Sequence, residues 1–238
     1  MKILAMDSSG LVASAAIMED YNLIAEYTVN YKKTHSQTLL PMIDELFRMT
    51  ETDKNSLDAI AIAAGPGSFT GLRIGAATAK GLALALDVPI IRVPTVDAYA
   101  YNLFNTAGLI CPLMDARRQQ VYTGLYRFSE GWFIVEKEQC AIGIDQVISY
   151  LNEKNEPVIF LGDGLPVNCT YIEENIATEY AYAPSHLSRQ RAGAVGALAL
   201  HFVDDPEYPG IRRETGEEHV PEYLRLSQAE REMLEKEK

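Results

Sequence analysis

Three aspartates have side chains that could do chemistry, and each stands at the end of a predicted strand. Asp7, Asp115 and Asp163 are followed or flanked by polar or glycine-rich turns. Carboxylates placed this way can hold a hydrated Mg²⁺ beside a phosphate, with backbone N–H groups close by. The same turns also contain Ser8, Ser9, Arg117, Gly162 and Gly164.

A purely structural interpretation of the same turns stays open. Aspartate begins turns because its carboxylate accepts hydrogen bonds from the following backbone. For any single aspartate this interpretation is favoured, but the matching positions in two halves of the chain raise the functional one. Arg117 and Arg118 fit an anion-binding turn and a solvated basic turn equally well.

The usual catalytic motifs are absent from the sequence. The chain has four histidines but no HxxxH or HExxH spacing, so no helix-borne metal pair is expected. It has no GxSxG nucleophile turn. The string at residues 65–75, GPGSFTGLRIG, is neither a P-loop nor a dinucleotide fingerprint. It predicts a tight strand-to-helix turn in which Ser68 or Thr70 caps the helix.

Composition limits the classes of partner and the compartment. The formal net charge of −12 in 238 residues repels phosphates, so direct docking of nucleic acid is disfavoured. The three cysteines are widely spaced and predict free thiols rather than a zinc site. The first residues lack the apolar core of a signal peptide, and no apolar stretch is long enough to span a bilayer. We therefore expect a cytoplasmic protein without a membrane role.

The helix predicted over residues 71–86 has a stripe of small residues along one side. Gly71, Gly75, Ala79 and Ala83 recur every four residues, which lets another helix approach closely. The rest of this helix is almost entirely apolar, with Arg73 and Lys80 as its charges. A helix that is apolar nearly all round requires burial on most sides.

The preceding helix, which begins near residue 34 or 36 and ends near 49, carries a similar excess of apolar residues. Two such neighbouring helices predict a contact surface for a second protein. A well-buried pair of core helices explains the same pattern equally well. The predicted interface residues are Leu39, Leu40, Ile43, Phe47, Gly71, Arg73, Ile74, Gly75, Thr78, Ala79 and Leu82.

The order of predicted elements repeats along the chain. Each half begins with three closely spaced strands, which indicates an antiparallel meander, and continues with alternating helices and strands. This order predicts two related α/β halves with mixed sheets. We expect an N-terminal half over residues 1–107, a C-terminal half over 108–226 and a charged tail over 227–238.

Taken together, these motifs resemble the TsaB (YeaZ-like) family over essentially the whole chain. The resemblance rests on the Asp7-Ser8-Ser9 turn and on the strings THSQTLLPMIDELF, GPGSFTGLRIG, MDARRQQVY, GDG and PEYLR, in that order. It implies the actin-like fold of duplicated ribonuclease-H-like halves. It further implies that the Asp7 and Asp115 turns correspond to phosphate loops and the Gly162-Asp163-Gly164 turn to an adenosine loop, all vestigial.

The resemblance also implies a non-catalytic role. In the paralogous catalytic family, TsaD, a helix carries an HxxxH metal motif, and the corresponding positions here are Thr95 and Tyr99. The chain should then lack that metal site and require no cofactor, with at most a weak ATP or ADP site with Mg²⁺.

The partners that the resemblance implies are a TsaD-type catalytic subunit and a TsaE-type ATPase, with a homodimer when the chain is alone. tRNA would be reached only indirectly, through the complex that makes threonylcarbamoyladenosine. The competing hypotheses are a small-molecule kinase or a metallopeptidase of the same fold, and a simple self-associating protein.

Overall fold

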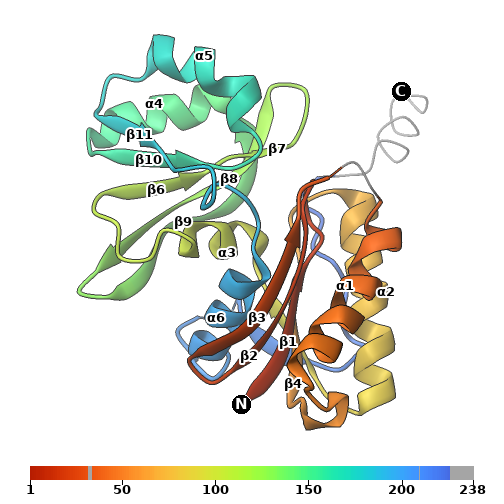
Figure 1. Cartoon of the computed structure of the whole chain (residues 1–238). Coiled ribbons are helices and arrows are strands. Elements are labelled where there is room, and N and C mark those ends of the chain that lie inside the picture. The colour runs from red at the N-terminus through yellow and green to blue at the C-terminus, as the bar shows by residue number, and fades with distance from the viewer. Residues whose placement is uncertain (32–33, 209, 226–238) are drawn as a thin grey trace.

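The computed structural model describes residues 1–31, 34–208 and 210–225, and they form two lobes (Figure 1). No helix in these ranges is both long enough and apolar enough to cross a membrane. The predicted tail at 227–238, and residue 226 of the predicted C-terminal half, lie outside the described residues.

The first lobe begins with an antiparallel meander and continues with parallel strands. Its sheet has the order β12-β5-β4-β1-β2-β3, in which β1 pairs antiparallel with β2 and parallel with β4. The elements up to the end of the first half are β1 (Lys2–Asp7), β2 (Ala13–Glu19), β3 (Asn22–Val29), α1 (His35–Thr50), the short 3₁₀-helix η1 (Lys54–Ser56), β4 (Ala59–Ala63), α2 (Phe69–Leu86) and β5 (Ile90–Val93).

The second lobe repeats this order. Its central strand β6 pairs antiparallel with β8 and parallel with β10, and β9 and β11 lie beyond them. The elements are β6 (Leu109–Pro112), β7 (Met114–Asp115), β8 (Gln120–Ser129), β9 (Trp132–Gly143), α4 (Ile144–Lys154), β10 (Val158–Leu161), α5 (Leu165–Asn175) and β11 (Tyr180–Tyr182). The shared strand order confirms the predicted actin-like fold of duplicated, ribonuclease-H-like halves.

The division of the chain at residue 107 does not follow the lobes. Helix α6 (Ala192–Phe202) packs on the first sheet, and β12 (Arg212–Glu214) pairs with β5 at the edge of that sheet. Helix α3 (Thr95–Tyr101) packs in turn against strands of the second lobe. The boundary between residues 1–107 and 108–226 was therefore placed wrongly, because both lobes exchange elements across it.

The faces of β1 show how the layers are held together. Leu4 and Met6 point into a core with α1 and α2, whereas Ile3 and Ala5 point into a second core with α6, α3 and the second sheet. Alternate residues of a strand face opposite sides of its sheet, so a strand buried on both faces is apolar throughout. Figure 1 shows α1 and α2 on one side of the first sheet and α6 on the other.

Of the two caps predicted for helix α2, the structure confirms Ser68. The Ser68 side chain accepts a hydrogen bond from Gly71 N at 3.3 Å and caps the helix. The helix starts at Phe69, two residues before the predicted start, because Ser68 itself is the cap. It ends at Leu86, as predicted.

Candidate functional site

The Asp7 turn is folded onto itself. Asp7 is buried, and its Oδ1 accepts hydrogen bonds from Ser9 N at 2.8 Å and from Ser9 Oγ at 2.6 Å. Burial raises the pKa of the Asp7 carboxyl, and these two hydrogen bonds oppose the rise. Both Ser9 donors are thus already used inside the turn.

The two turns of the second lobe are joined by a hydrogen bond. Asp115 N donates to Asp163 Oδ1 at 3.2 Å, and Asp115 Oδ1 accepts from Arg117 N at 2.7 Å. Arg117 and Arg118 both have positive φ, at 61° and 55°. Gly162 has a φ of +119°, and a Cβ on it would lie 2.1 Å from Leu113 O, so only glycine fits there.

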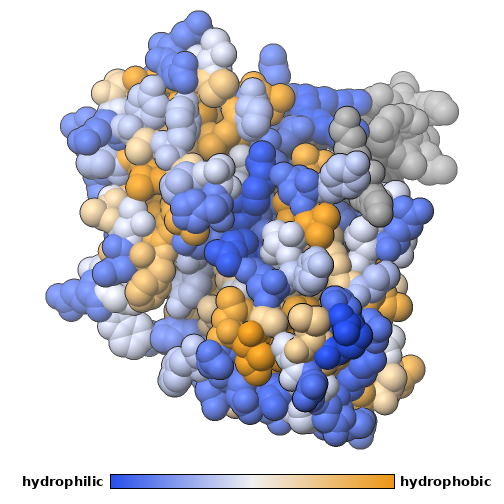
Figure 2. Space-filling view, viewed as in Figure 1, coloured by the Kyte–Doolittle hydropathy of each residue, from blue (hydrophilic) through white to orange (hydrophobic). Residues whose placement is uncertain are grey.

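The structure brings these turns together at the seam between the lobes. The charge of Asp163 is among the causes that raise the pKa of Asp7, and burial is the largest cause for both carboxyls. Hydrophilic side chains gather between the lobes on the face seen in Figure 2. The predicted phosphate and nucleotide turns are therefore neighbours in space, although they are far apart in sequence.

Two side chains pack on the first of these turns. Gln190 is buried, and its Nε2 lies 1.7 Å from where a Cβ on Gly10 would be, so it occupies the space next to that glycine. His35 Nε2 is 2.8 Å from Gly10 O on the same turn. Asp7 and Asp163 place two carboxyls close to this turn, and together they repel a phosphate that brings no cation with it.

The helix that carries the metal motif in the paralogous family has other roles here. Thr95 Oγ1 accepts a hydrogen bond from Gly65 N at 3.0 Å, which ties α3 to the glycine loop. Tyr99 is buried. Among the described residues, no group of three or more His, Cys, Asp or Glu side chains is arranged to hold a metal ion.

The predicted interface residues fall into two sets, one that faces the core of the chain and one that faces solvent. Burial of the first set contradicts its assignment to an interface. We call Gly71, Gly75, Ala79 and Ala83 the inner stripe. A Cβ on Gly71 would lie 2.1 Å from Ser8 O, and one on Gly75 would lie 2.3 Å from Ser8 Oγ. The stripe is small because α2 packs closely on the Asp7 turn and the first sheet of its own chain. Leu39, Ile43, Phe47, Gly71, Gly75 and Ala79 are all buried there, so these residues were wrongly assigned to an interface.

The outward set lies on the opposite side of α2 and on α1. Leu40 and Arg73 are exposed, and Ile74, Thr78 and Leu82 are partly exposed. Sequence reasoning missed a second row of small residues with the same spacing.

We call Arg73, Ala77, Gly81, Leu84 and Ala85 the outer stripe. All of these residues are exposed, and Leu84 keeps 83% of its surface accessible. A Cβ on Gly81 would meet nothing within 4 Å. The signal was present in the sequence, since residues 77, 81 and 85 repeat every four positions. The pattern alone does not say which of two small stripes faces the core.

A C-terminal strap, residues 215–225, engages both charges of α2. Lys80 Nζ donates to His219 O at 3.0 Å, and Arg73 lies over the Phe69 ring at 4.5 Å. The Phe69 ring stacks in turn on Tyr223 with centroids 4.1 Å apart. At its end, Arg225 donates to carbonyl groups of the Asp115–Arg118 turn. The strap thus runs from α2 to the second lobe.

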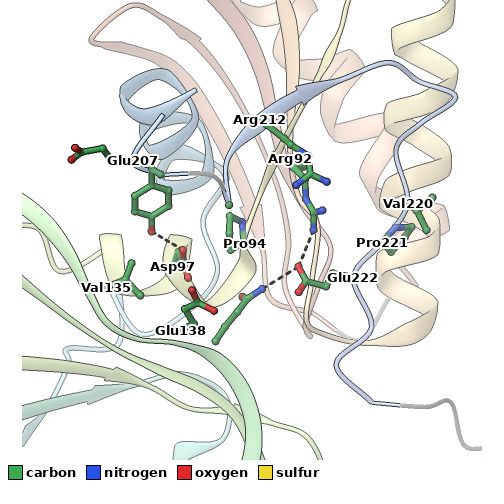
Figure 3. A pocket seen from close by; sticks show the side chains of 13 residues that line it. Arg92, Pro94, Asp97, Val135, Glu138, Glu207, Arg212, Val220, Pro221 and Glu222 are labelled. Atoms are coloured by element: carbon green, nitrogen blue, oxygen red, sulfur yellow. Dashed lines mark hydrogen bonds and ion pairs between the residues drawn. The ribbon is translucent and has the colours of Figure 1, made fainter. Parts of the chain in front are cut away.

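A pocket of about 620 Å³ lies beside this strap, and sequence reasoning did not find it (Figure 3). Asp97 of α3 is buried at its wall and accepts hydrogen bonds from Tyr126 Oη at 2.7 Å and Tyr208 Oη at 2.6 Å. Burial raises the pKa of Asp97 to about 6, and the charges of Glu222 and Glu138 act in the same direction.

Comparisons with known proteins agree on one family. A family model described as TsaD, tRNA N6-adenosine threonylcarbamoyltransferase, matches residues 22–230. The tRNA threonylcarbamoyladenosine biosynthesis protein TsaB of Bacillus subtilis is 35% identical over 242 residues, covering 100% of both chains. The TsaB of Haemophilus influenzae is 28% identical and covers 89% of this chain and 92% of its own.

The solved structure of YeaZ from Pseudomonas aeruginosa has the same fold. It aligns with a TM-score of 0.77 at 24% identity and covers 94% of this chain and 99% of its own. The sequence relatives and the family model both span nearly the whole of this chain. The chain therefore belongs to the TsaB (YeaZ-like) family, within the wider group that the TsaD model describes.

Proposed function

We propose that this chain is the non-catalytic subunit of the complex that makes threonylcarbamoyladenosine in tRNA, and that it binds a TsaD-type catalytic subunit through the outward face of α1 and α2. Family membership supports the pathway, since the curated relatives are named for it. The observation that carries the binding face is the outer stripe. It places small and apolar residues in solvent along one side of a helix whose other side is fully packed.

The outer stripe suits a helix of another protein. Side chains at i, i+4 and i+8 form a ridge or groove along a helix, and small residues in that row let two helix axes come close. Ala77 and Gly81 form the shallow part, with Leu84 and Leu40 as flanking apolar groups that gain from burial. This arrangement supports a helix–helix interface with the catalytic subunit, and the same surface would pair two copies when the chain is alone.

The absence of a catalytic role is supported by the state of the candidate groups. Asp7 is engaged by its own turn, and Thr95 serves the glycine loop. We propose that the chain needs no cofactor, and that any ATP or ADP with Mg²⁺ binds weakly, since Gln190 would have to move from Gly10 first. The net charge of −12 supports a contact with tRNA that is indirect and made through the complex. We place this complex in the cytoplasm. A TsaE-type ATPase completes the proposed set of partners.

Co-purification with the TsaD-type subunit tests this proposal. Ala77→Arg places a long charged side chain in the shallow part of the outer stripe and should abolish the complex. Ser149→Arg, on the exposed face of α4, is the matched control and should leave the complex intact. Circular dichroism should first establish that both variants are folded. A complex that forms equally well with folded Ala77→Arg would disprove the proposed face.

A further inference from the structure

The pocket beside the strap carries more negative charge than its arginines neutralise. Arg92 Nη2 is 2.8 Å from Glu222, and Arg92 and Arg212 both pair with Glu214, at 3.8 and 3.0 Å. Those arginines and glutamates therefore balance one another. Three other carboxylates line the pocket, those of Asp97, Glu138 and Glu207, and none of them has an ion-pair partner among the described residues.

The carboxylates of Asp97 and Glu138 converge on the pocket from two elements, α3 and β9. Figure 3 shows Asp97 from α3 and Glu138 from β9 pointing toward one another, and the charge of Glu138 is among the causes that raise the pKa of Asp97. Like charges held close together favour a cation between them. Asp97 is fixed by the hydroxyl groups of Tyr126 and Tyr208, whereas Glu138 is exposed and free to close on a ligand.

Part of the remaining wall is apolar and suited to carbon, beside the polar side chains of Arg92, Arg212 and Gln139. Val135, Pro94, Val220 and Pro221 line the pocket, and none of them offers a side-chain metal ligand. Within the described ranges no metal-binding group of carboxylates, histidines or cysteines is formed. The volume of about 620 Å³ is in the range of small-molecule sites.

We propose that this pocket binds a small aliphatic cation, in which an ammonium or guanidinium group on a methylene chain sits between Asp97 and Glu138. The cationic head replaces the missing counter-charge and donates hydrogen bonds to both carboxylates. The methylene chain lies along the proline and valine wall. The ligand is either a free amine or a basic side chain of a partner protein, and both present the same chemistry.

Titration calorimetry at constant ionic strength tests the proposal on the full chain. Putrescine is the probe, and 1,4-butanediol, its uncharged analogue, is the control. We expect millimolar or tighter binding of putrescine and none of the diol. Glu138→Gln should weaken putrescine binding by about tenfold, the loss of one charge-assisted contact. Because Glu138 is exposed, this variant should fold normally.

Glu207→Gln is the matched variant, since Glu207 lines the same pocket but its side chain points away from Asp97 in Figure 3. This substitution removes one negative charge, as Glu138→Gln does, but it should change the affinity for putrescine little. Equal losses in the two variants would mean non-specific attraction to an acidic protein and would overturn the proposal. Binding of butyrate in place of putrescine would overturn it too, because recognition would then belong to the arginines.

The pH dependence and a second probe complete the test. Asp97 is faced by Tyr126, Tyr208, Glu138 and Glu222, and its pKa of about 6 means that it gains its charge near that pH. Putrescine affinity should therefore rise as pH increases from 5 to 8, and a flat profile would contradict the placement at Asp97. N-acetyl-lysine amide distinguishes the sources: tighter binding of this probe than of putrescine identifies a side chain of a partner, and the reverse identifies a free amine.

Discussion

Gly81 gives the sharpest prediction, because a single copy of the chain has no use for a glycine there. It lies in the middle of α2, is exposed, and a Cβ on it would meet nothing within 4 Å. Glycine inside a helix costs about 1 kcal/mol relative to alanine, because it loses more backbone freedom on folding. At concentrations where the chain is monomeric, Gly81→Leu should therefore stabilise it by roughly 0.5–1 kcal/mol, or about 1–4 °C in Tm.

The same substitution should weaken the complex with a TsaD-type subunit. If a partner helix lies close to α2 at Gly81, the leucine side chain must push it away, and overpacking of this kind costs about 1–3 kcal/mol. That corresponds to a loss of roughly 5- to 150-fold in affinity. The predicted changes in stability and in affinity for the partner have opposite signs. This is informative because a misfolded variant would lose both stability and binding.

Thermal melts followed by circular dichroism and titration calorimetry with the partner give the two readouts. Ser149→Leu on the exposed face of α4 is the control for adding a leucine to a helix surface, and it should leave affinity unchanged. A Gly81→Leu chain with a raised Tm and unchanged affinity would refute the idea that this glycine serves an interface. A lowered Tm would refute the reading of Gly81 as unpacked.

Two further predictions concern stability. Gly75→Leu should prevent folding or lower the Tm of the isolated chain strongly, because a Cβ there would lie 2.3 Å from Ser8 Oγ inside the core. A thermal melt of Gly75→Leu like that of the wild type would contradict this packing. Asp97 has a pKa raised from 3.8 to about 6, so the fold favours its protonated form, and the stability that this group contributes should fall by about 2 kcal/mol as pH rises from 4 to 7. Denaturant titrations should show a smaller fall in Asp97→Asn, and parallel profiles for the two proteins would contradict the assignment.

Local patterns in the sequence were enough to predict most of the elements and the duplicated fold. The meanders, the apolar strand at Ala59–Ala63 and the end of α2 at Leu86 all lie where turn residues and periodicity indicate. The exchange of α6 and β12 into the first lobe was not predictable in this way. Their apolar periodicity requires burial but does not identify which sheet provides it.

The two small stripes on α2 show the same limit at the level of the site. Residues 71, 75 and 79 and residues 77, 81 and 85 have equivalent spacing, so both are compatible with a close helix contact. Only the structure shows that the turn at Ser8 packs against the first of these rows. The pocket at Asp97 was missed for a related reason, since its carboxylates come from α3, β9 and the strap and form no motif in the sequence.

The aspartate turns illustrate why a preserved phosphate-loop position is weak evidence for phosphate binding. Asp7 bonds to the Ser9 amide and hydroxyl, and Asp163 bonds to the Asp115 amide, so each carboxyl shapes a turn of the fold itself. Such hydrogen bonds stabilise the turns whether or not a ligand is present. An aspartate at these positions therefore stabilises its turn in a chain that binds no phosphate as well as in one that does. The residues that distinguish a turn that binds phosphate from one that does not are those packed over the turn. In this chain Gln190 packs over the turn at Gly10.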